Sequence, residues 1–170
     1  MATTPLATSD GITVHPATHA RFDDVRTMIG PKKPTSNVCW CLSHRLPAKD
    51  NLELAGQERA DVVEALTRRR TKPGVLAYDG DEVVGWAAVA PRADLPFARS
   101  TKIPHIDDLP VWSVWCLRVR PGHRGRGEKV DLTMAYVGTR ALFEGAGFTL
   151  AAETTATSGG FLRVVVRRTA

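Results

Sequence analysis

The chain has 170 residues, of which 43% are hydrophobic and 24% are charged, a composition typical of one soluble globular domain. No stretch approaches the roughly 18–20 consecutive apolar residues that a membrane span needs. The first ten residues lack the basic and apolar regions of a secretion signal. We therefore expect a frayed polar tail over 1–10 and a single domain over 11–170.

The net charge of +5 and the three cysteines narrow the choice of partner and compartment. A basic chain suits an anionic partner, but charge alone does not distinguish nucleic acid, a membrane and a phosphorylated cofactor. An odd number of cysteines in a chain of this size favours reduced thiols and a cytoplasmic protein. Cys39, Cys41 and His44 lack the two-plus-two spacing of zinc sites, so we expect no metal.

The first half of the chain predicts a strand, two helices and a hairpin. Residues 12–15 favour a short strand that ends at Pro16. Apolar residues at helical spacing predict helices over 19–29 and 55–70. Asp79 and Gly80 lie between two runs of β-forming residues and predict a tight antiparallel hairpin with a type I′ turn.

The second half predicts a long proline-containing loop over 91–110, followed by a strand over 111–119 that is apolar on both faces and therefore central in a sheet. A short helix over 138–146 and strands over 148–153 and 161–168 complete the chain. This order predicts an α+β fold with a mixed, mostly antiparallel sheet flanked by helices, and not the regular alternation of a doubly wound sheet.

The stretch from Arg120 to Gly127 (RPGHRGRG) follows the predicted central strand directly and alternates glycine with arginine. Glycines allow backbone N–H groups to turn toward an anion, and arginines add full charges. A strand, such a loop and the N-terminus of a following helix together form a receptor for a diphosphate. Taken alone, the loop is equally consistent with a solvated basic turn.

The run LRVRPGHRGRG over 117–127 resembles the acyl-CoA-binding motif of the GNAT superfamily of N-acetyltransferases. The matching positions are Val119, Pro121, His123, Arg124 and Gly127. The predicted hairpin before it and the run ALFEGAGF over 141–148 also resemble elements of that superfamily. The resemblance extends from about residue 12 to the end, and it implies acetyl transfer from acetyl-CoA to a primary amine of a small molecule or peptide.

The resemblance assigns the cofactor contacts mostly to the main chain. The strand end would pair with pantetheine and donate to the thioester carbonyl, and the loop amides would bind the diphosphate. The residues concerned are Cys116, Leu117, Val119, His123, Arg124, Gly125, Arg126 and Gly127. The segment around Trp40, together with Trp86, Trp112 and Trp115, is expected to shape the acceptor side of the cleft.

Direct acyl transfer also needs a proton donor and a general base. Phe143 occupies the position where many superfamily members carry a tyrosine that protonates the leaving thiolate. Tyr136 lies about two helical turns earlier and is our candidate donor, with a packing role as the alternative. For the base we expect Asp107 and Asp108 in the long loop, where His105 also lies, with Glu82 and Ser113 as weaker candidates.

The chain departs from the superfamily pattern after the loop. Lys129 replaces a small residue, and only 128–137 separate Gly127 from Gly138. The superfamily places a helix and a parallel strand there, whose connection alone needs at least about 10–12 residues. Either both are missing, which would expose a sheet edge and favour a homodimer, or the sequence joins two segments across absent residues. We favour a break near 127–128, which Cα atoms farther apart than about 3.8 Å would reveal.

Two other functions compete with acyl transfer. Phe143 and Lys129 favour a degenerate module that binds acyl-CoA without catalysis. The pI near 9.4 and the three arginines at 68–70 suggest nucleic-acid binding as another possible function. No helix-turn-helix, zinc-finger or RNA-binding motif accompanies this charge, so we expect no nucleic-acid partner.

Overall fold

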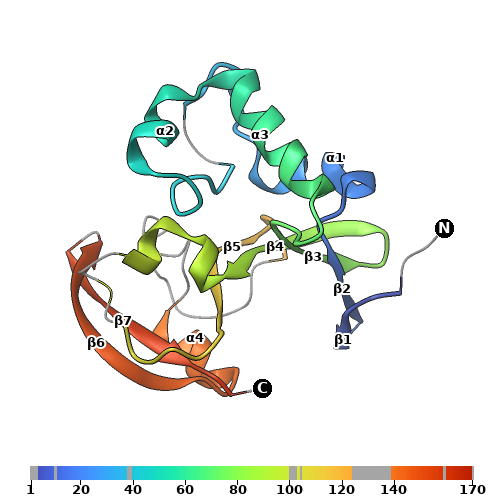
Figure 1. The fold of residues 1–170 in the computed structure, drawn as a ribbon. Coiled ribbons are helices and arrows are strands. Elements are labelled where there is room, and N and C mark those ends of the chain that lie inside the picture. Colours follow the sequence, from blue (N-terminus) through green and yellow to red (C-terminus); the bar gives the residue numbers. More distant parts are fainter. Residues whose placement is uncertain are drawn as a thin grey trace.

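The computed structural model describes residues 4–9, 11–37, 40–99, 103, 105–123, 139–158 and 160–169. Figure 1 shows the order of the elements. The first half contains β1 (Ala7–Ser9), β2 (Ile12–Pro16), a 3-10 turn (His19–Arg21), α1 (Phe22–Ile29), α2 (Ala48–Glu53), α3 (Gly56–Arg68) and β3 (Gly74–Asp79). The second half contains β4 (Glu82–Pro91), two 3-10 turns (Arg92–Asp94 and Pro96–Arg99), β5 (Trp112–Val119), α4 (Arg140–Gly145), β6 (Thr149–Ser158) and β7 (Phe161–Arg167).

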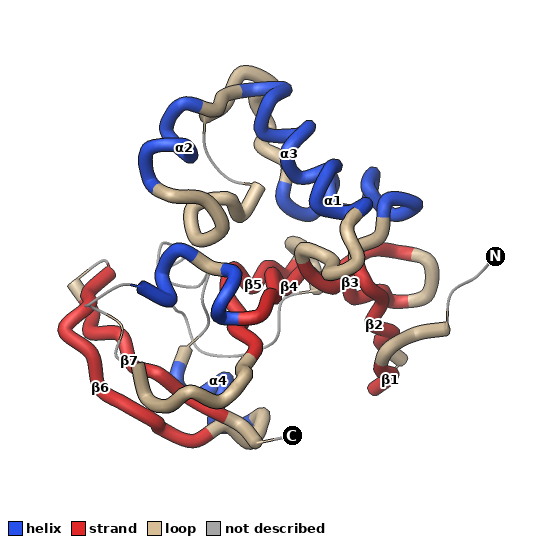
Figure 2. The backbone as a smooth tube through the Cα atoms, in the orientation of Figure 1, coloured by secondary structure: helices blue, strands red, loops and turns tan. Residues whose placement is uncertain are grey.

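The strands form two antiparallel sheets. The larger has the order β1-β2-β3-β4-β5, and β6 pairs with β7 in the smaller. Helices α1 and α3 lie together over one face of the larger sheet, and the β6–β7 hairpin lies to its side (Figure 2). The predicted α+β fold with a mostly antiparallel sheet is therefore confirmed. Within the described residues, β5 is the last strand of the larger sheet and lies at its edge, whereas its apolar composition predicted a central strand.

The core lies between the helices and the larger sheet. Helix α1 buries Phe22, Val25, Met28 and Ile29, which recur at helical spacing and face β4. Burial of each such side chain contributes roughly 1.5–3 kcal/mol, so this apolar face is sufficient to hold the helix on the sheet. Leu76 on β3 is completely buried beneath it.

The hairpin between β3 and β4 forms as predicted, but its turn is shifted by one residue. Asp79 pairs with Glu82, so the two central residues are Gly80 and Asp81. Only Gly80 has a positive φ, of 56°. A positive φ at the first central position alone is typical of a type II′ turn, in which glycine is preferred at that position. The predicted type I′ turn is therefore wrong.

Two elements were not predicted. Strand β1 lies within the expected polar tail and pairs with β2. Helix α2 is short and exposed, and it is held by the fully buried Arg59 of α3. The guanidinium donates to the carbonyls of Asn51 and Leu54, at 2.8 and 3.2 Å, and to the side-chain oxygen of Asn51 at 2.8 Å. A tertiary contact of this kind has no signature in local sequence.

The expectation of reduced thiols is also wrong for two of the three cysteines. A disulfide joins Cys41 to Cys116, with their Cα atoms 6.3 Å apart. The two residues are separated by 75 positions in the sequence, and only the packing of the segment after α1 against β5 brings them together. Cys39 lies outside the described residues, as does the suspected break near 127–128.

No helix within the described ranges is both long enough and apolar enough to cross a membrane.

The disulfide is expected to stabilise the fold substantially, because it closes a loop of 75 residues in the unfolded chain. Reduction, or Cys41→Ser, should lower the free energy of unfolding by about 2–4 kcal/mol. Urea unfolding with and without dithiothreitol measures the difference. Cys39→Ser is the control and should keep the sensitivity to reductant. Superimposable wild-type curves in both conditions would contradict the prediction.

Candidate functional site

Strand β5 contains a bulge at Cys116. On β4, Ala88 pairs with Trp115 and the neighbouring Ala87 pairs with Leu117. Cys116 therefore has no partner residue on β4 in the strand register. Cys116 also has a positive φ of 51°, which is unusual for a residue with a Cβ. An extra residue of this kind bends the strand and turns its main-chain groups out of the ladder. Such bulges are frequent beside active sites.

The disulfide ties this bulge to a second irregular segment. Trp40 and Cys41 both have positive φ, of 57° and 55°, and both are buried. The segment they begin continues to His44, whose pKa is lowered by burial and by the nearby charge of Arg163 on β7. The segment after α1 therefore lies between the bulge in β5 and the β6–β7 hairpin.

Arg45 and Trp115 pack behind the bulge. The Arg45 guanidinium lies 5.0 Å from the centre of the Trp115 ring and donates to the Pro73 carbonyl at 2.9 Å. Burial lowers the pKa of Arg45 to about 10, so the side chain is protonated at neutral pH. A cation over an aromatic face is attracted by the ring quadrupole. This contact holds β5 at Trp115, the buried residue directly before the bulge.

The expected tryptophan lining of the acceptor side is mostly wrong. Trp40, Trp86 and Trp115 are 6%, 4% and 3% exposed and belong to the hydrophobic core. Trp112, at the start of β5, is 61% exposed. Large aromatic side chains are easily mistaken for site residues in a sequence, because burial depends on the strand face that they occupy.

The end of β5 leads into a turn that is tied to the neighbouring hairpin. Arg118 donates to the Met28 carbonyl at the end of α1, at 2.8 Å. The Arg120 N–H donates to the Val84 carbonyl on β4 at 2.8 Å. The chain then turns through Gly122, whose φ of +94° favours glycine, and the His123 N–H donates to the Arg120 carbonyl at 3.1 Å. The predicted loop therefore begins with a hydrogen-bonded reverse turn from Arg120 to His123.

Two basic side chains of this turn meet acidic groups of the β3–β4 hairpin. Arg120 Nη1 lies 2.7 Å from Glu82 Oε1, and His123 Nε2 lies 3.3 Å from Glu82 Oε2. His123 Nδ1 also lies 3.8 Å from Asp79 Oδ2. These contacts hold the predicted cofactor turn against the hairpin. Sequence reasoning placed Glu82 among the weaker base candidates and missed this pairing, because the two elements are distant in the chain.

The candidate bases in the loop before β5 have different surroundings. Asp107 Oδ2 accepts a hydrogen bond from Arg167 Nη1 on β7, and this bond lowers the pKa of the Asp107 carboxyl. His105 Nε2 lies 2.9 Å from Asp108 Oδ1, and His105 Nδ1 lies 3.4 Å from Arg92 Nη1. Asp107 is therefore an anchor between the loop and β7, whereas His105 and Asp108 form a solvent-accessible pair.

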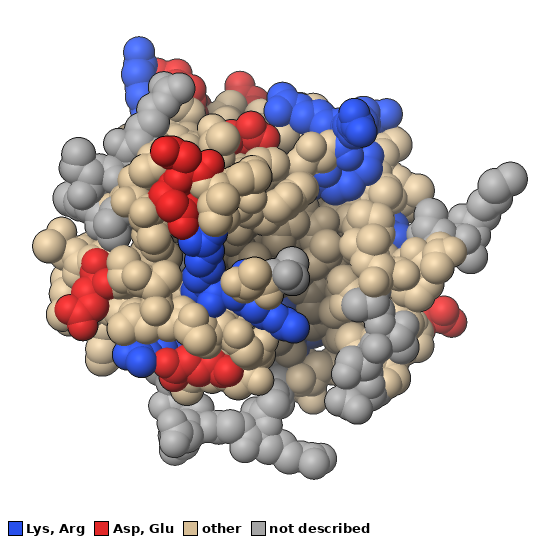
Figure 3. Space-filling view, turned by 60° about the horizontal axis from the view of Figure 1, so that its bottom comes forward, with Lys and Arg blue, Asp and Glu red and all other residues tan. Residues whose placement is uncertain are grey.

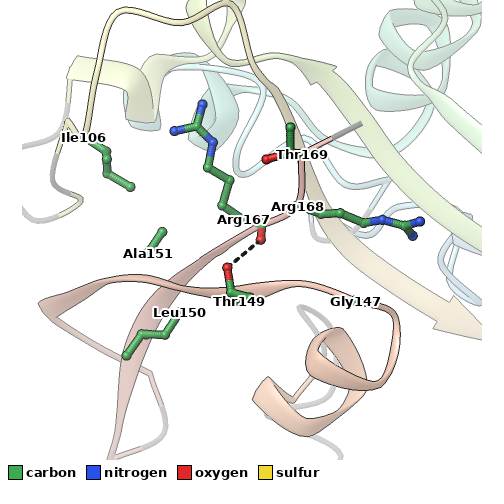
Figure 4. Close-up of a pocket in the computed structure, with 8 residues that line it drawn as sticks. All are labelled: Ile106, Gly147, Thr149, Leu150, Ala151, Arg167, Arg168 and Thr169. Atoms are coloured by element: carbon green, nitrogen blue, oxygen red, sulfur yellow. Dashed lines mark hydrogen bonds between the residues drawn. The ribbon is translucent and has the colours of Figure 1, made fainter.

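A hollow of about 510 Å³ lies beside this loop (Figure 4). Ile106 borders it on the loop side, and the ends of β6 and β7 form the opposite wall. Its lining combines apolar side chains, two hydroxyls and two arginines; the residues are Ile106, Gly147, Thr149, Leu150, Ala151, Arg167, Arg168 and Thr169. One Arg168 nitrogen donates to the Ala146 carbonyl at 3.0 Å. The hollow is of a size that suits a small molecule.

Helix α4 places Phe143 against Phe148. The Thr139 side chain caps the helix by accepting from the Leu142 N–H at 3.2 Å. The rings of Phe143 and Phe148 meet edge to face, with their centres 5.3 Å apart. Phe143 thus makes an aromatic packing contact at the position expected for a proton donor.

Several predicted site residues lie outside the described residues. They are Arg124, Gly125, Arg126, Gly127 and Tyr136. Of the predicted cofactor contacts, Cys116, Leu117, Val119 and His123 lie on β5 and its following turn. In the described part of the chain, no three His, Cys, Asp or Glu side chains are grouped so that they could hold a metal ion.

Basic and acidic side chains are intermixed on the face drawn in Figure 3. Lys and Arg form several separate groups, with Asp and Glu side chains between them. A nucleic-acid-binding face is typically a continuous basic patch. The net charge of the chain is therefore not gathered on this face into such a patch.

Comparison with protein families gives a match that covers the middle of the chain. The model of the acetyltransferase (GNAT) family matches residues 41–127, about half of the chain. This range runs from the disulfide residue Cys41 to the last residue of the predicted cofactor loop, and it contains the bulge in β5. No significant match was found among curated proteins or among solved structures.

The Asp107–Arg167 pair should respond to pH in a defined way. Because the pKa of Asp107 is lowered, the stability from this pair is present above the ordinary value of 3.8 and is lost as the pH falls through the lower folded value. Arg167→Gln should return the pKa toward 3.8, measured by carbon NMR titration of the carboxyl. Arg168→Gln, one residue along, should leave it lowered. An unchanged pKa in Arg167→Gln would contradict the assignment.

Proposed function

Because the chain belongs to the acetyltransferase (GNAT) family, we propose that it transfers an acyl group, most simply acetyl, from acetyl-CoA to a primary amine. The amine attacks the thioester carbonyl directly while both substrates are bound. A C–N bond forms, the C–S bond breaks, and CoA leaves as the thiolate. The protein must bind the thioester, accept a proton from the amine and supply one to the thiolate.

The bulge at Cys116 is the observation that carries this proposal. It turns main-chain groups out of the β4–β5 ladder at the strand that leads directly into the arginine- and glycine-rich stretch. A thioester carbonyl needs such a preoriented backbone donor. We assign the thioester and pantetheine contacts to the backbone of Cys116, Leu117 and Val119.

The diphosphate of CoA is assigned to the loop that begins at His123. Its amides, with those of Arg124, Gly125, Arg126 and Gly127, would form the anion site, and the arginines would add charge. The ordered turn before His123 supports this assignment, because it fixes the direction in which the loop leaves β5. The chemistry of these donors suits an anionic cofactor.

We propose the pair His105 and Asp108 as the general base, with Asp107 as the anchor of their loop. When His105 Nε2–H donates to Asp108, Nδ1 is the acceptor and can take the amine proton directly or through water. The 3.4 Å contact of Nδ1 with Arg92 is long enough for substrate or water to replace it. Asp107 is a weaker base, because Arg167 stabilises its charged form.

The thiolate needs a different donor. Phe143 carries no proton and packs on Phe148. Tyr136 remains our proposal for this role, with water as the alternative.

The hollow beside the loop is proposed as the acceptor site. Its volume of about 510 Å³ suits a small amine or the end of a peptide. Thr149, Thr169 and the apolar Ile106 and Leu150 offer both polar and apolar contacts.

A second candidate is an acyl-CoA-binding module without catalysis. The specific observation in its favour is Phe143, which packs on Phe148 where a hydroxyl would serve the reaction. This module would keep the cofactor contacts of β5 and lose turnover on every amine.

Release of free CoA thiol from acetyl-CoA with a panel of amines tests the two functions. The enzyme predicts amine-dependent release, and His105→Gln should lower kcat by about a hundredfold because a general base contributes at least that much. The KM for acetyl-CoA should stay unchanged. His19→Gln is the control, since this exposed imidazole pairs with Glu64 of α3 and should have wild-type kcat.

Two outcomes would contradict these assignments. CoA binding without release on any amine would favour the module. Wild-type kcat in His105→Gln would remove the proposed base while leaving the transfer reaction in place.

A further inference from the structure

We propose that Glu82, the first residue of β4, is a positioning residue for the cofactor turn. Its carboxylate holds the two basic residues on either side of Pro121 and Gly122, so that the loop after β5 leaves the strand in one direction. This inference rests on the proposed function, which assigns the CoA diphosphate to the loop that begins at His123.

Each oxygen of the Glu82 carboxylate meets a different side of the turn. Oε1 lies 2.7 Å from Arg120 Nη1, and Oε2 lies 3.3 Å from His123 Nε2. The same Arg120 nitrogen donates to the Val83 carbonyl at 3.3 Å, and the Arg120 N–H donates to the Val84 carbonyl at 2.8 Å. The start of β4 is therefore the surface on which the turn rests.

The turn needs such a support because, within the described part of the chain, it has little packing at its centre. Apart from its two chain neighbours, no described atom lies within 4 Å of an added Cβ at Gly122, and Pro121 is exposed. Segments with few buried contacts open easily. Side-chain bridges from Arg120 and His123 to one carboxylate restrict the turn where hydrophobic burial does not.

The negative charge of Glu82 makes this role testable, because a positioning role and a purely electrostatic role predict opposite changes in CoA affinity when the charge is removed. Asp79, Asp81 and Glu82 lie together on the β3–β4 hairpin, beside a turn proposed to lead into an anion site. A carboxylate near a diphosphate repels it. If Glu82 acted only through its charge, its removal would tighten CoA binding. If it positions the turn, its removal weakens CoA binding.

Asp81 provides a matched control for the charge. It lies in the same hairpin turn, one residue before Glu82, and is exposed. Within the described residues it forms no ion pair with Arg120 or His123. Asp81→Asn and Glu82→Gln remove the same charge from nearly the same place, and only the second removes the bridge.

Calorimetric titration of CoA into the two variants and the wild type tests the proposal. Glu82→Gln should weaken binding about three- to fivefold, the range of a solvent-accessible ion-pair network. Its KM for acetyl-CoA should rise by the same factor, with kcat at saturation unchanged. Asp81→Asn should bind CoA as tightly as the wild type or slightly more tightly. Glu82→Gln binding as tightly as Asp81→Asn would overturn the proposal.

The Arg120→Gln background separates positioning from a general loss of stability. If Glu82 acts through this turn, adding Glu82→Gln to Arg120→Gln should weaken CoA binding by less than the effect of Glu82→Gln alone. Fully additive losses, or a thermal unfolding midpoint of Glu82→Gln below the assay temperature, would overturn the positioning role. A wild type that binds no CoA would instead refute the proposed function, on which this inference depends.

Discussion

One extra residue in β5 is the constraint on which the rest of the site depends. At Cys116 the strand loses its simple register with β4, and the main chain after it leads through Val119 into the turn at Gly122. The disulfide to Cys41 and the packing of Arg45 on Trp115 hold the bulge from the core side. A positive φ at a residue with a Cβ is costly, and these tertiary contacts offset that cost.

Two of the arginines serve a structural role. Arg120 and Arg167 are engaged by carboxylates, so their charges hold one segment against another. Because the net charge of +5 already subtracts these carboxylates, the two pairs are neutral and the excess positive charge lies on other residues. Our proposal places the anion site at one loop, where backbone amides and neighbouring arginines would supply the donors.

Local patterns were sufficient to predict α1 and α3, from apolar residues at helical spacing, and the β3–β4 hairpin, from Asp79 and Gly80 between two runs of β-forming residues. They also predicted β2, β5, α4, β6 and β7. They also identified the family, through the residues that follow β5. They did not predict the disulfide, the bulge or the Glu82 bridge. Each of these depends on residues that only the folded sheet brings together. The type II′ turn was missed because a shift of one residue in the strand pairing makes Gly80 and Asp81, and not Asp79 and Gly80, the two central residues of the turn.

The central claim is that the bulge of β5 and the turn after it bind acyl-CoA. Titration of CoA into isotope-labelled protein, followed through backbone amide signals, tests it most directly. The account predicts that the largest shifts within the described residues fall between Cys116 and His123. Shifts confined to other elements, or no shifts at saturating CoA, would contradict it.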